Sequence, residues 1–132
     1  MDDDRCATEI PSSDGLASHP LSPAANQVLL EGQLLASVDY RVTPTGRPVL
    51  FLEIEHDSRH EQPDSSLSFQ ARMPVMALGE LAARCRSLTP GCTLRVSGRL
   101  NQKRWVKDGK VRWGRLELVA MEIRMLAAAD PS

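Results

Sequence analysis

Aromatic residues are scarce in this sequence, with two Trp, two Phe and one Tyr among 132 residues, and its three cysteines include no C-x-x-C pair. Three cysteines at these spacings fit neither a disulfide framework nor a zinc site, so Cys6, Cys85 and Cys92 are expected to be free thiols. No segment approaches the roughly 18 apolar residues of a membrane-spanning helix, and the acidic start MDDDRCATEI lacks the basic region of a secretory signal. We therefore expect a cytoplasmic protein.

Sequence signatures of catalysis are also missing, because there is no G-x-S-x-G, Walker or Rossmann glycine pattern. His56 and His60 have the spacing of metal ligands on a helix, but they fall where a predicted strand enters a loop and have no third ligand. We interpret them as exposed histidines. The sequence predicts a protein that is not an enzyme and that holds no cofactor or metal.

Charge is divided unevenly along the chain. Residues 1–66 contain 4 Lys and Arg against 12 Asp and Glu, a balance of −8, whereas residues 67–132 contain 12 against 5, a balance of +7. The near-neutral total therefore hides a strongly basic half, which indicates a partner of dense negative charge.

The chain divides into three parts by composition. Residues 1–26 are rich in Ser, Pro, Ala and Asp without apolar periodicity, which predicts a disordered leader. Residues 27–126 have the patterning of one folded domain. Residues 127–132 are expected to form a short disordered C-terminus.

Five segments of the folded part have the alternation or apolar content of strands: Gln27–Val38, Pro48–Asp57, Leu67–Met76, Cys92–Leu100 and Arg115–Leu126. A turn over Thr43–Gly46 joins the first two, and a polar loop over Ser58–Ser66 follows the second. Asp108-Gly109, a strong hairpin signal, lies between the last two.

A helix is predicted within residues 79–91. Leu81, Cys85 and Leu88 have helical spacing there, and Thr89-Pro90-Gly91 ends the pattern, so we expect two to three turns. Pro74 cannot donate a hydrogen bond to a sheet and is expected at an edge, a bulge or a strand end.

The order of these elements predicts the fold. Three strands, one short helix and two further strands match an all-β, five-stranded Greek-key barrel of the oligonucleotide/oligosaccharide-binding (OB) type, with the helix between strands 3 and 4. A β-sandwich would normally need about seven strands. An OB barrel binds its ligand on its middle strands and on the loops between strands 1–2 and 4–5.

The densest charge lies between Arg95 and Arg115, where eight cations accompany one acid, Asp108. Two of the five aromatic residues also lie there. Cations that follow phosphates, together with flat rings that stack on bases, are the chemistry of single-stranded nucleic acid binding. The candidate binding residues of this stretch are Arg99, Lys103, Arg104, Trp105, Lys107, Lys110, Arg112, Trp113 and Arg115.

Each of these features has an alternative interpretation. A basic hairpin can be simply solvated, and its tryptophans can hold the two strands together by cross-strand packing. We favour nucleic acid for the charges because nearly all have one sign, whereas stacking and structural roles are equally supported for Trp105 and Trp113. Phe69 is a further stacking candidate, although a core position fits it slightly better, and Phe51 is expected in the core.

Three stretches resemble the family of primosomal replication protein N, or PriB: TPTGRPVLFLEIEH (43–56), RMPVMALG (72–79) and GCTLRVSGRL (91–100). The shared features are a Ser/Thr-Pro-x-Gly turn, a strand that ends in Glu-His, a Met-Pro pair and a V-x-G-x-L strand. Residues 94–123 are also similar to bacterial single-stranded-DNA-binding proteins, through V-x-G-x-L and D-G-x-x-R.

The resemblance implies a homodimeric OB barrel that binds single-stranded DNA, is not an enzyme, and acts in replication restart. Such proteins help to reload the replicative helicase at stalled forks, together with the primosomal helicase PriA and the protein DnaT. The resemblance maps DNA contacts onto Lys103, Arg104, Lys107, Lys110 and Arg115. Phe69 matches the family's third-strand aromatic residues only in part, and the leader lies outside the pattern.

Two other hypotheses are kept. General single-stranded-DNA-binding proteins continue into a Gly/Pro/Gln-rich tail with an acidic tip, which the ending MLAAADPS does not provide, so the primosomal function is preferred. A protein-interaction barrel that never touches nucleic acid is the third hypothesis. Salt-dependent oligonucleotide binding would separate it from the first two.

A homodimer is also expected on physical grounds. Leu29, Leu35, Val119 and Met121 are predicted at outward apolar positions beside strand edges, and two-fold pairing would cover them with the same patch on both subunits. The alternative is that these residues belong to one packed core.

Overall fold

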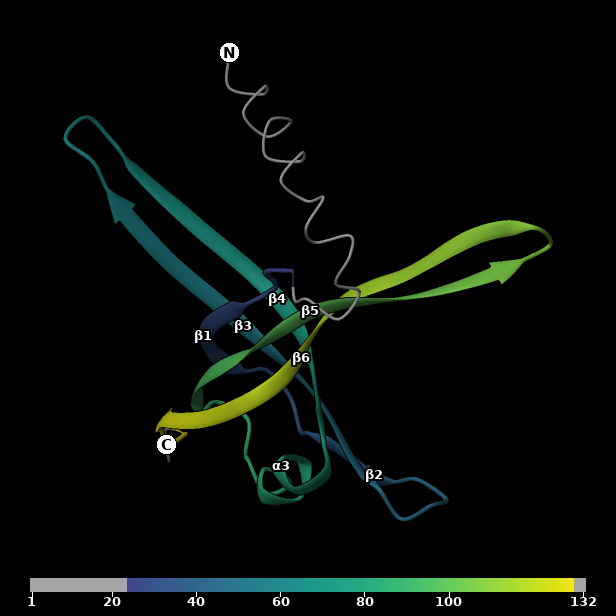
Figure 1. Ribbon diagram of the computed structural model, residues 1–132. Coiled ribbons are helices and arrows are strands. Elements are labelled where there is room, and N and C mark those ends of the chain that lie inside the picture. The colour runs from purple at the N-terminus through teal and green to yellow at the C-terminus, as the bar shows by residue number, and fades with distance from the viewer. Residues whose placement is uncertain (1–23, 130–132) are drawn as a thin grey trace.

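The computed structural model describes residues 24–129 as six strands and one short helix (Figure 1). The elements are β1 (Val28–Leu34), β2 (Asp39–Val42), β3 (Pro48–Glu61), β4 (Ser66–Leu78), α3 (Gly79–Arg84), β5 (Thr93–Lys107) and β6 (Lys110–Ala127). Residues 1–23 of the predicted leader and residues 130–132 lie outside the described part. Within residues 24–129, no helix has the length and apolar content needed to cross a membrane.

Five strands close into a barrel in the order β1-β5-β6-β4-β3. The ring closes where Gln33 and Leu34 of β1 pair with Glu55 and Ile54 of β3. β4 and β6 run parallel, whereas the other neighbours are antiparallel, and β2 pairs with β3 outside the ring. The predicted all-β OB barrel, with its helix between the third and fourth barrel strands, is confirmed.

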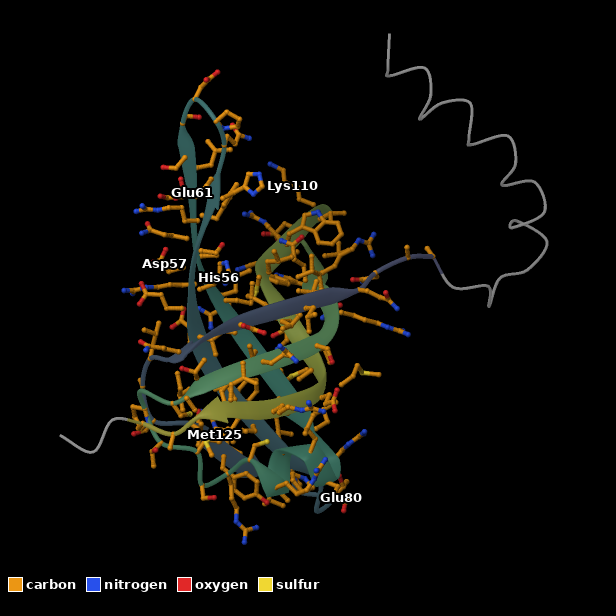
Figure 2. All side chains as sticks on the ribbon, turned by 90° about the vertical axis from the view of Figure 1, so that its left-hand side faces the viewer. His56, Asp57, Glu61, Glu80, Lys110 and Met125 are labelled. Atoms are coloured by element: carbon orange, nitrogen blue, oxygen red, sulfur yellow. The ribbon has the colours of Figure 1, made fainter. Side chains whose placement is uncertain are left out.

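Two pairs of strands are longer than predicted and leave the barrel as arms on opposite sides (Figure 1). The β3–β4 arm comprises residues 57–70, with Asp57 and Glu61 along it (Figure 2), so the predicted loop over Ser58–Ser66 is mostly paired strand. The β5–β6 arm comprises residues 101–116. Antiparallel pairing continues without a core beneath it because the strands satisfy each other's backbone N–H and C=O groups.

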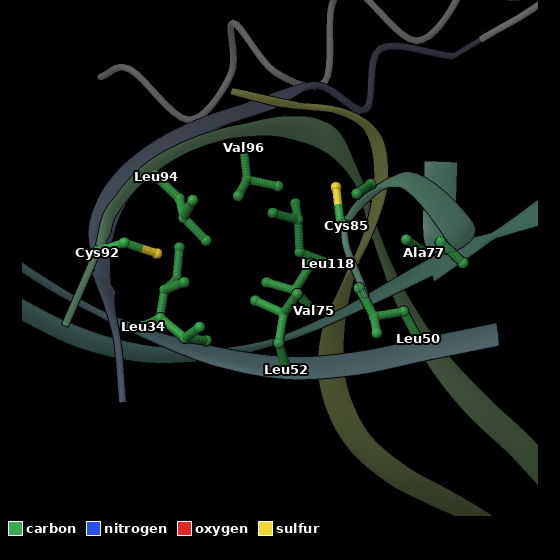
Figure 3. Packing of buried hydrophobic residues seen from close by; sticks show 13 residues of the cluster. Leu34, Leu50, Leu52, Val75, Ala77, Cys85, Cys92, Leu94, Val96 and Leu118 are labelled. Carbon is green, nitrogen blue, oxygen red and sulfur yellow. The ribbon is translucent and has the colours of Figure 1, made fainter. Parts of the chain in front are cut away.

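Alternation along the barrel strands builds the core. In β3, Leu50, Leu52 and Ile54 are buried while the residues between them face outward, and β5 alternates in the same way. The buried cluster contains no polar or charged residue in the part of the chain described, apart from two thiols (Figure 3). Its largest fully buried members are Leu34, Leu50, Ile54, Val75, Cys92, Leu94, Val96 and Leu118.

Local differences from the predicted elements have physical causes. The first predicted strand, Gln27–Val38, ends earlier than expected, at Leu34, and β2 is a further short strand that was not predicted. The helix spans only six residues because the backbone at Cys85 leaves helical geometry and its N–H closes the last turn onto Leu81 and Ala82. Pro74 lies inside β4, one residue before pairing with β6 begins, so β4 has a neighbour on one side there, the edge position that the sequence predicts.

Candidate nucleic-acid interface

The β5–β6 arm ends in a two-residue turn at Asp108 and Gly109. Their φ angles of 53° and 75° both lie in the left-handed region, which gives a hairpin turn whose twist matches that of the flanking strands. Lys107 and Lys110 pair directly across it. The predicted Asp-Gly hairpin is confirmed, and it places two cations at the tip of the arm.

Cross-strand pairing sorts the arm's side chains onto two faces, because directly opposed residues share a face and neighbours alternate. Trp105 opposes Arg112, and Lys107 opposes Lys110, on one side of the arm. A Cβ on Gly114 would lie 3.4 Å from the Trp105 ring and 3.5 Å from the Lys103 Cβ, which places Lys103 on that side too. We define this cationic face as Lys103, Trp105, Lys107, Lys110 and Arg112.

The opposite face of the arm carries Arg104 opposed to Trp113 and Val106 opposed to Val111. We define it as the apolar face. The guanidinium of Arg104 lies 5.9 Å from the centroid of the Trp113 ring, within cation–π range. The two tryptophans therefore point in opposite directions. A single strand of nucleic acid that lies along one face can stack its bases on only one of the two rings.

The remaining predicted cations lie at the base of the arm. Arg99 is on the same side of β5 as the cationic face, because each of the three register shifts between β5 and β6 adds its extra residue to β6. Arg115 lies beside one of these shifts. Arg95, which contributes to the charge of the sequence stretch, is held by Glu31 with an N–O distance of 2.7 Å and belongs to the barrel wall.

Phe69 lies on the other arm, opposite Ser58, with 51% of its surface exposed. The slight preference for a core position was therefore wrong, since the arm extends beyond the core. Leu67 and His60 share its face, and no lysine or arginine does. The structure separates Phe69 from the cationic face instead of bringing the two together.

Two cation–aromatic pairs that the sequence reasoning missed lie near the β2–β3 turn, on opposite sides of the paired strands, because Tyr40 pairs with the buried Leu50 whereas Phe51 faces outward. The guanidinium of Arg41 lies 5.9 Å from the Phe51 ring centroid, and Arg86 lies at the same distance from Tyr40. Hydrogen bonds from Arg41 to the Asp39 carboxylate, together with its charge, raise the pKa of Arg41 and fix the side chain. The prediction of Phe51 as a core residue was wrong, because it alternates with Leu50 and Leu52, which fill the core.

Successive strand pairs connect the base of the β5–β6 arm with the Arg41–Phe51 pair. Arg99 pairs with Val119, Val119 with Met76, and Met76 with Phe51. Residues in such a row share one side of the sheet, and the partial or full exposure of all four shows that this side is the outer surface. One outer surface therefore leads from Arg99, at the base of the arm, across Val119 and Met76 to Phe51 and its partner Arg41.

The two predicted histidines take no part in a ligand cluster. His56 Nδ1 contacts the Glu31 carbonyl at 2.7 Å and its Nε2 contacts the Ser58 hydroxyl at 2.8 Å, so both ring nitrogens are engaged. His60 lies farther out on the arm. Within residues 24–129, no three His, Cys, Asp or Glu side chains are grouped to hold a metal ion.

Comparison with known sequences places this geometry in a family. A family model described as "another single-strand binding protein family" matches residues 26–112, more than half of the chain. The replication restart protein PriB of Photorhabdus laumondii subsp. laumondii is 32% identical over 108 residues, which cover 80% of this chain and 97% of that protein. The single-stranded DNA-binding protein of Aquifex aeolicus is 24% identical over 76% of this chain and 69% of its own length.

Solved structures agree with this assignment. The single-stranded DNA binding protein of Thermus aquaticus superposes with a TM-score of 0.66 and 30% identity over 77% of this chain, which spans half of that protein. A small single-stranded DNA-binding protein of Streptomyces coelicolor, at 21% identity and a TM-score of 0.58 over 75% of this chain and 92% of its own, shares the fold. With the closed OB barrel and the match to PriB over nearly that protein's whole length, the chain belongs to the single-strand binding protein superfamily and to its PriB family.

Proposed function

We propose that this protein binds single-stranded DNA along the cationic face of the β5–β6 arm. The observation that carries the proposal is the register, which surrounds the Trp105 ring with Lys103, Lys107, Lys110 and Arg112 on one exposed surface. The cations contact phosphates while the ring stacks on a base, a contribution of roughly 1–3 kcal/mol that tolerates any base. Single-strand binding by the relatives named above supports this choice of ligand.

The bound strand continues from the arm onto the outer surface of the barrel. Arg99 lies at the start of this path, and Phe51 with its stacked Arg41 lies at the end, which provides a second ring and a second cation. On the arm and on the barrel alike, the cations contact phosphates and the protein rings stack on the faces of bases. Neither kind of contact reads base edges, so binding has weak sequence preference.

The cellular role that fits best is replication restart, in the cytoplasm, as a homodimeric primosome component that works with PriA and DnaT. The match to a replication restart protein over 97% of its length supports this role. A general single-stranded-DNA-binding protein is the second candidate, supported by the Aquifex and Thermus relatives. Both roles need the same DNA interface and differ in their protein partners.

Charge reversal tests the interface. We expect the variant Lys103→Glu/Lys107→Glu/Lys110→Glu to bind labelled mixed-sequence oligonucleotides more weakly, with a log–log salt slope about 2 smaller, because each lost phosphate contact removes roughly 0.7. The matched control is Arg59→Glu/Arg72→Glu/Arg124→Glu, which makes the same change of charge at exposed positions outside the β5–β6 arm.

Fluorescence anisotropy across a salt series measures both variants, with circular dichroism to show that each is folded. Equal affinities and slopes for the two variants would contradict the assignment of the cationic face. Duplex bound as tightly as single strands would contradict stacking on Trp105.

A further inference from the structure

The cationic face of the β5–β6 arm has little counter-charge in the described part of the chain. All three lysines of the sequence lie on it, together with Arg112, and the single acid of the arm is Asp108 in its turn. Within residues 24–129, none of these four cations forms an ion pair. Five arginines elsewhere in those residues do: Arg41, Arg59, Arg72, Arg95 and Arg124.

Negative charge is concentrated in the sequence that precedes the described domain. Residues 1–23 contain five acids against one arginine, a balance of −4, and we define them as the acidic segment. Three of its acids are consecutive, so one short stretch offers several carboxylates to a group of lysines. The five acids are Asp2, Asp3, Asp4, Glu9 and Asp14.

The acidic segment joins the domain beside the cationic face. The Asn26 side chain is hydrogen-bonded to both backbone groups of Leu100, with N–O distances of 3.0 and 2.9 Å, which fixes the start of the domain at the base of the β5–β6 arm. Residues 24–27 line a hollow of about 420 Å³ with Arg99, which is on the same side of β5 as the cationic face. The chain therefore enters the domain at one end of the row of cations.

The acidic segment is long enough to reach the tip of the arm. Lys107 lies seven positions after Leu100, a distance of about 24 Å at roughly 3.4 Å per strand residue. Ala24 lies twenty positions after Asp4, and that length of chain spans up to about 70 Å. The consecutive acids are therefore within reach of all three lysines, and attachment at the base of the arm gives them a high effective concentration there.

We propose that the acidic segment occupies the cationic face in the absence of DNA and that a single strand must displace it. The carboxylates of residues 2–4 then take the places of phosphates against Lys103, Lys107 and Lys110. Apparent affinity for DNA falls with the fraction of chains whose face is free. The proposal rests on the proposed function, because it makes the segment a competitor for the face that we assign to DNA.

Zero-length cross-linking of the full chain tests the contact. A water-soluble carbodiimide joins a carboxylate to a lysine amine where the two touch, and every lysine of the sequence lies on the cationic face. We expect mass spectrometry to find links from residues 2–4 to these lysines at least several-fold more often than links from exposed control acids. The controls lie on the β3–β4 arm, on the opposite side of the barrel (Figure 1), and are Asp57, Glu61 and Asp64.

Three outcomes of the cross-linking bear on the proposal. In a mixture of isotope-labelled and unlabelled protein the links should join peptides of one chain, and links between chains would overturn the proposal by assigning the contact to a second copy. Absence of links, while an oligonucleotide still protects the lysines from acetylation, would overturn it and leave the proposed function standing. Links that a saturating oligonucleotide does not reduce would instead refute the proposed function.

Affinity measurements test the competition. Asp2→Asn/Asp3→Asn/Asp4→Asn should bind a labelled mixed-sequence oligonucleotide at least several-fold more tightly than the parent at low salt, because the face is free more of the time. The gain should shrink as salt is raised, since screening weakens the competitor. The matched control, Asp57→Asn/Glu61→Gln/Asp64→Asn, makes the same change of net charge outside the acidic segment. Equal affinities of the two variants would overturn the proposal.

Discussion

At the scale of single residues, the two tryptophans are the clearest case in which position leads us to expect different roles. Trp105 lies among cations and Trp113 lies with valines on the reverse face. We expect Trp105→Ala to lose roughly 1–3 kcal/mol of single-strand affinity through lost stacking, and Trp113→Ala to bind a short oligonucleotide normally.

Anisotropy titrations measure the affinities, and thermal melting of both variants shows whether the hairpin still supports the fold. Because each tryptophan lies on an exposed arm, we expect both melting temperatures to stay near that of the parent. If Trp113→Ala lost single-strand affinity and Trp105→Ala kept it, the DNA-binding surface would have to be the apolar face instead of the cationic face.

Two buried thiols allow a prediction about reactivity. Desolvation by burial raises the pKa of Cys85 and of Cys92, and the thiolate is the reactive form. In a Cys6→Ser background, iodoacetamide at pH 8.5 should label these residues much more slowly in the native protein than in denaturant, as mass spectrometry would show. A thiol whose pKa is raised by folding contributes stability that is fully present below its unfolded pKa and is lost as the pH rises through its folded pKa. Rapid native labelling would contradict this burial.

At the scale of elements, the register between β5 and β6 depends on one close approach. A Cβ on Gly98 would overlap the Val119 carbonyl, at the point where an extra residue enters β6. We expect Gly98→Ala to lower the free energy of unfolding by about 1–3 kcal/mol, the usual cost of overpacking. Ser97→Ala, one residue earlier on the same strand, is the control, and urea denaturation measures both. Equal stabilities would mean that the strands adjust at no cost.

The barrel and the hairpin turn could be predicted from sequence because each depends on local signals. Leu50, Leu52 and Ile54 alternate within one strand, and Asp108-Gly109 specifies a turn by itself. The two faces of the arm could not be predicted, because they depend on where β6 takes up its extra residues against β5. Phe51 was misplaced for a related reason: alternation shows that two apolar sets exist, but only packing shows which set fills the core.

One long-range contact illustrates what no local pattern contains. Asn26 lies two residues before β1, and the register of β1 with β5, extended to it, places it opposite Leu100 at the base of the β5–β6 arm. Its side-chain amide donates to the Leu100 carbonyl at 3.0 Å and accepts from the Leu100 N–H at 2.9 Å. The side chain thus replaces the backbone pair that would continue the sheet, and it fastens the arm to the start of the folded domain.

At the scale of the whole molecule, one edge and one outer face of the barrel have no cover from residues 24–129. Residues Val28–Gly32 of β1 pair with β5 alone, since pairing with β3 begins at Gln33. Beside this edge, Leu29 and Met121 are exposed and, with Arg99, line a groove of about 520 Å³. Two of the four apolar residues predicted to face outward, Leu29 and Met121, are thus exposed, whereas Leu35 and Val119 are half-buried.

An open strand edge beside exposed apolar side chains is the surface that two-fold pairing covers. We expect the protein to be a homodimer through this edge, with light scattering giving twice the monomer mass at micromolar concentration. Leu29→Glu/Met121→Glu should give folded monomers, because two buried like charges would face their copies across the axis, whereas the control Val42→Glu stays dimeric. Since a dimer carries two cationic faces, the monomeric variant should lose more affinity for a long oligonucleotide than for a short one. A parent protein that is monomeric at micromolar concentration would contradict the dimer and would favour a role in which each barrel binds DNA alone.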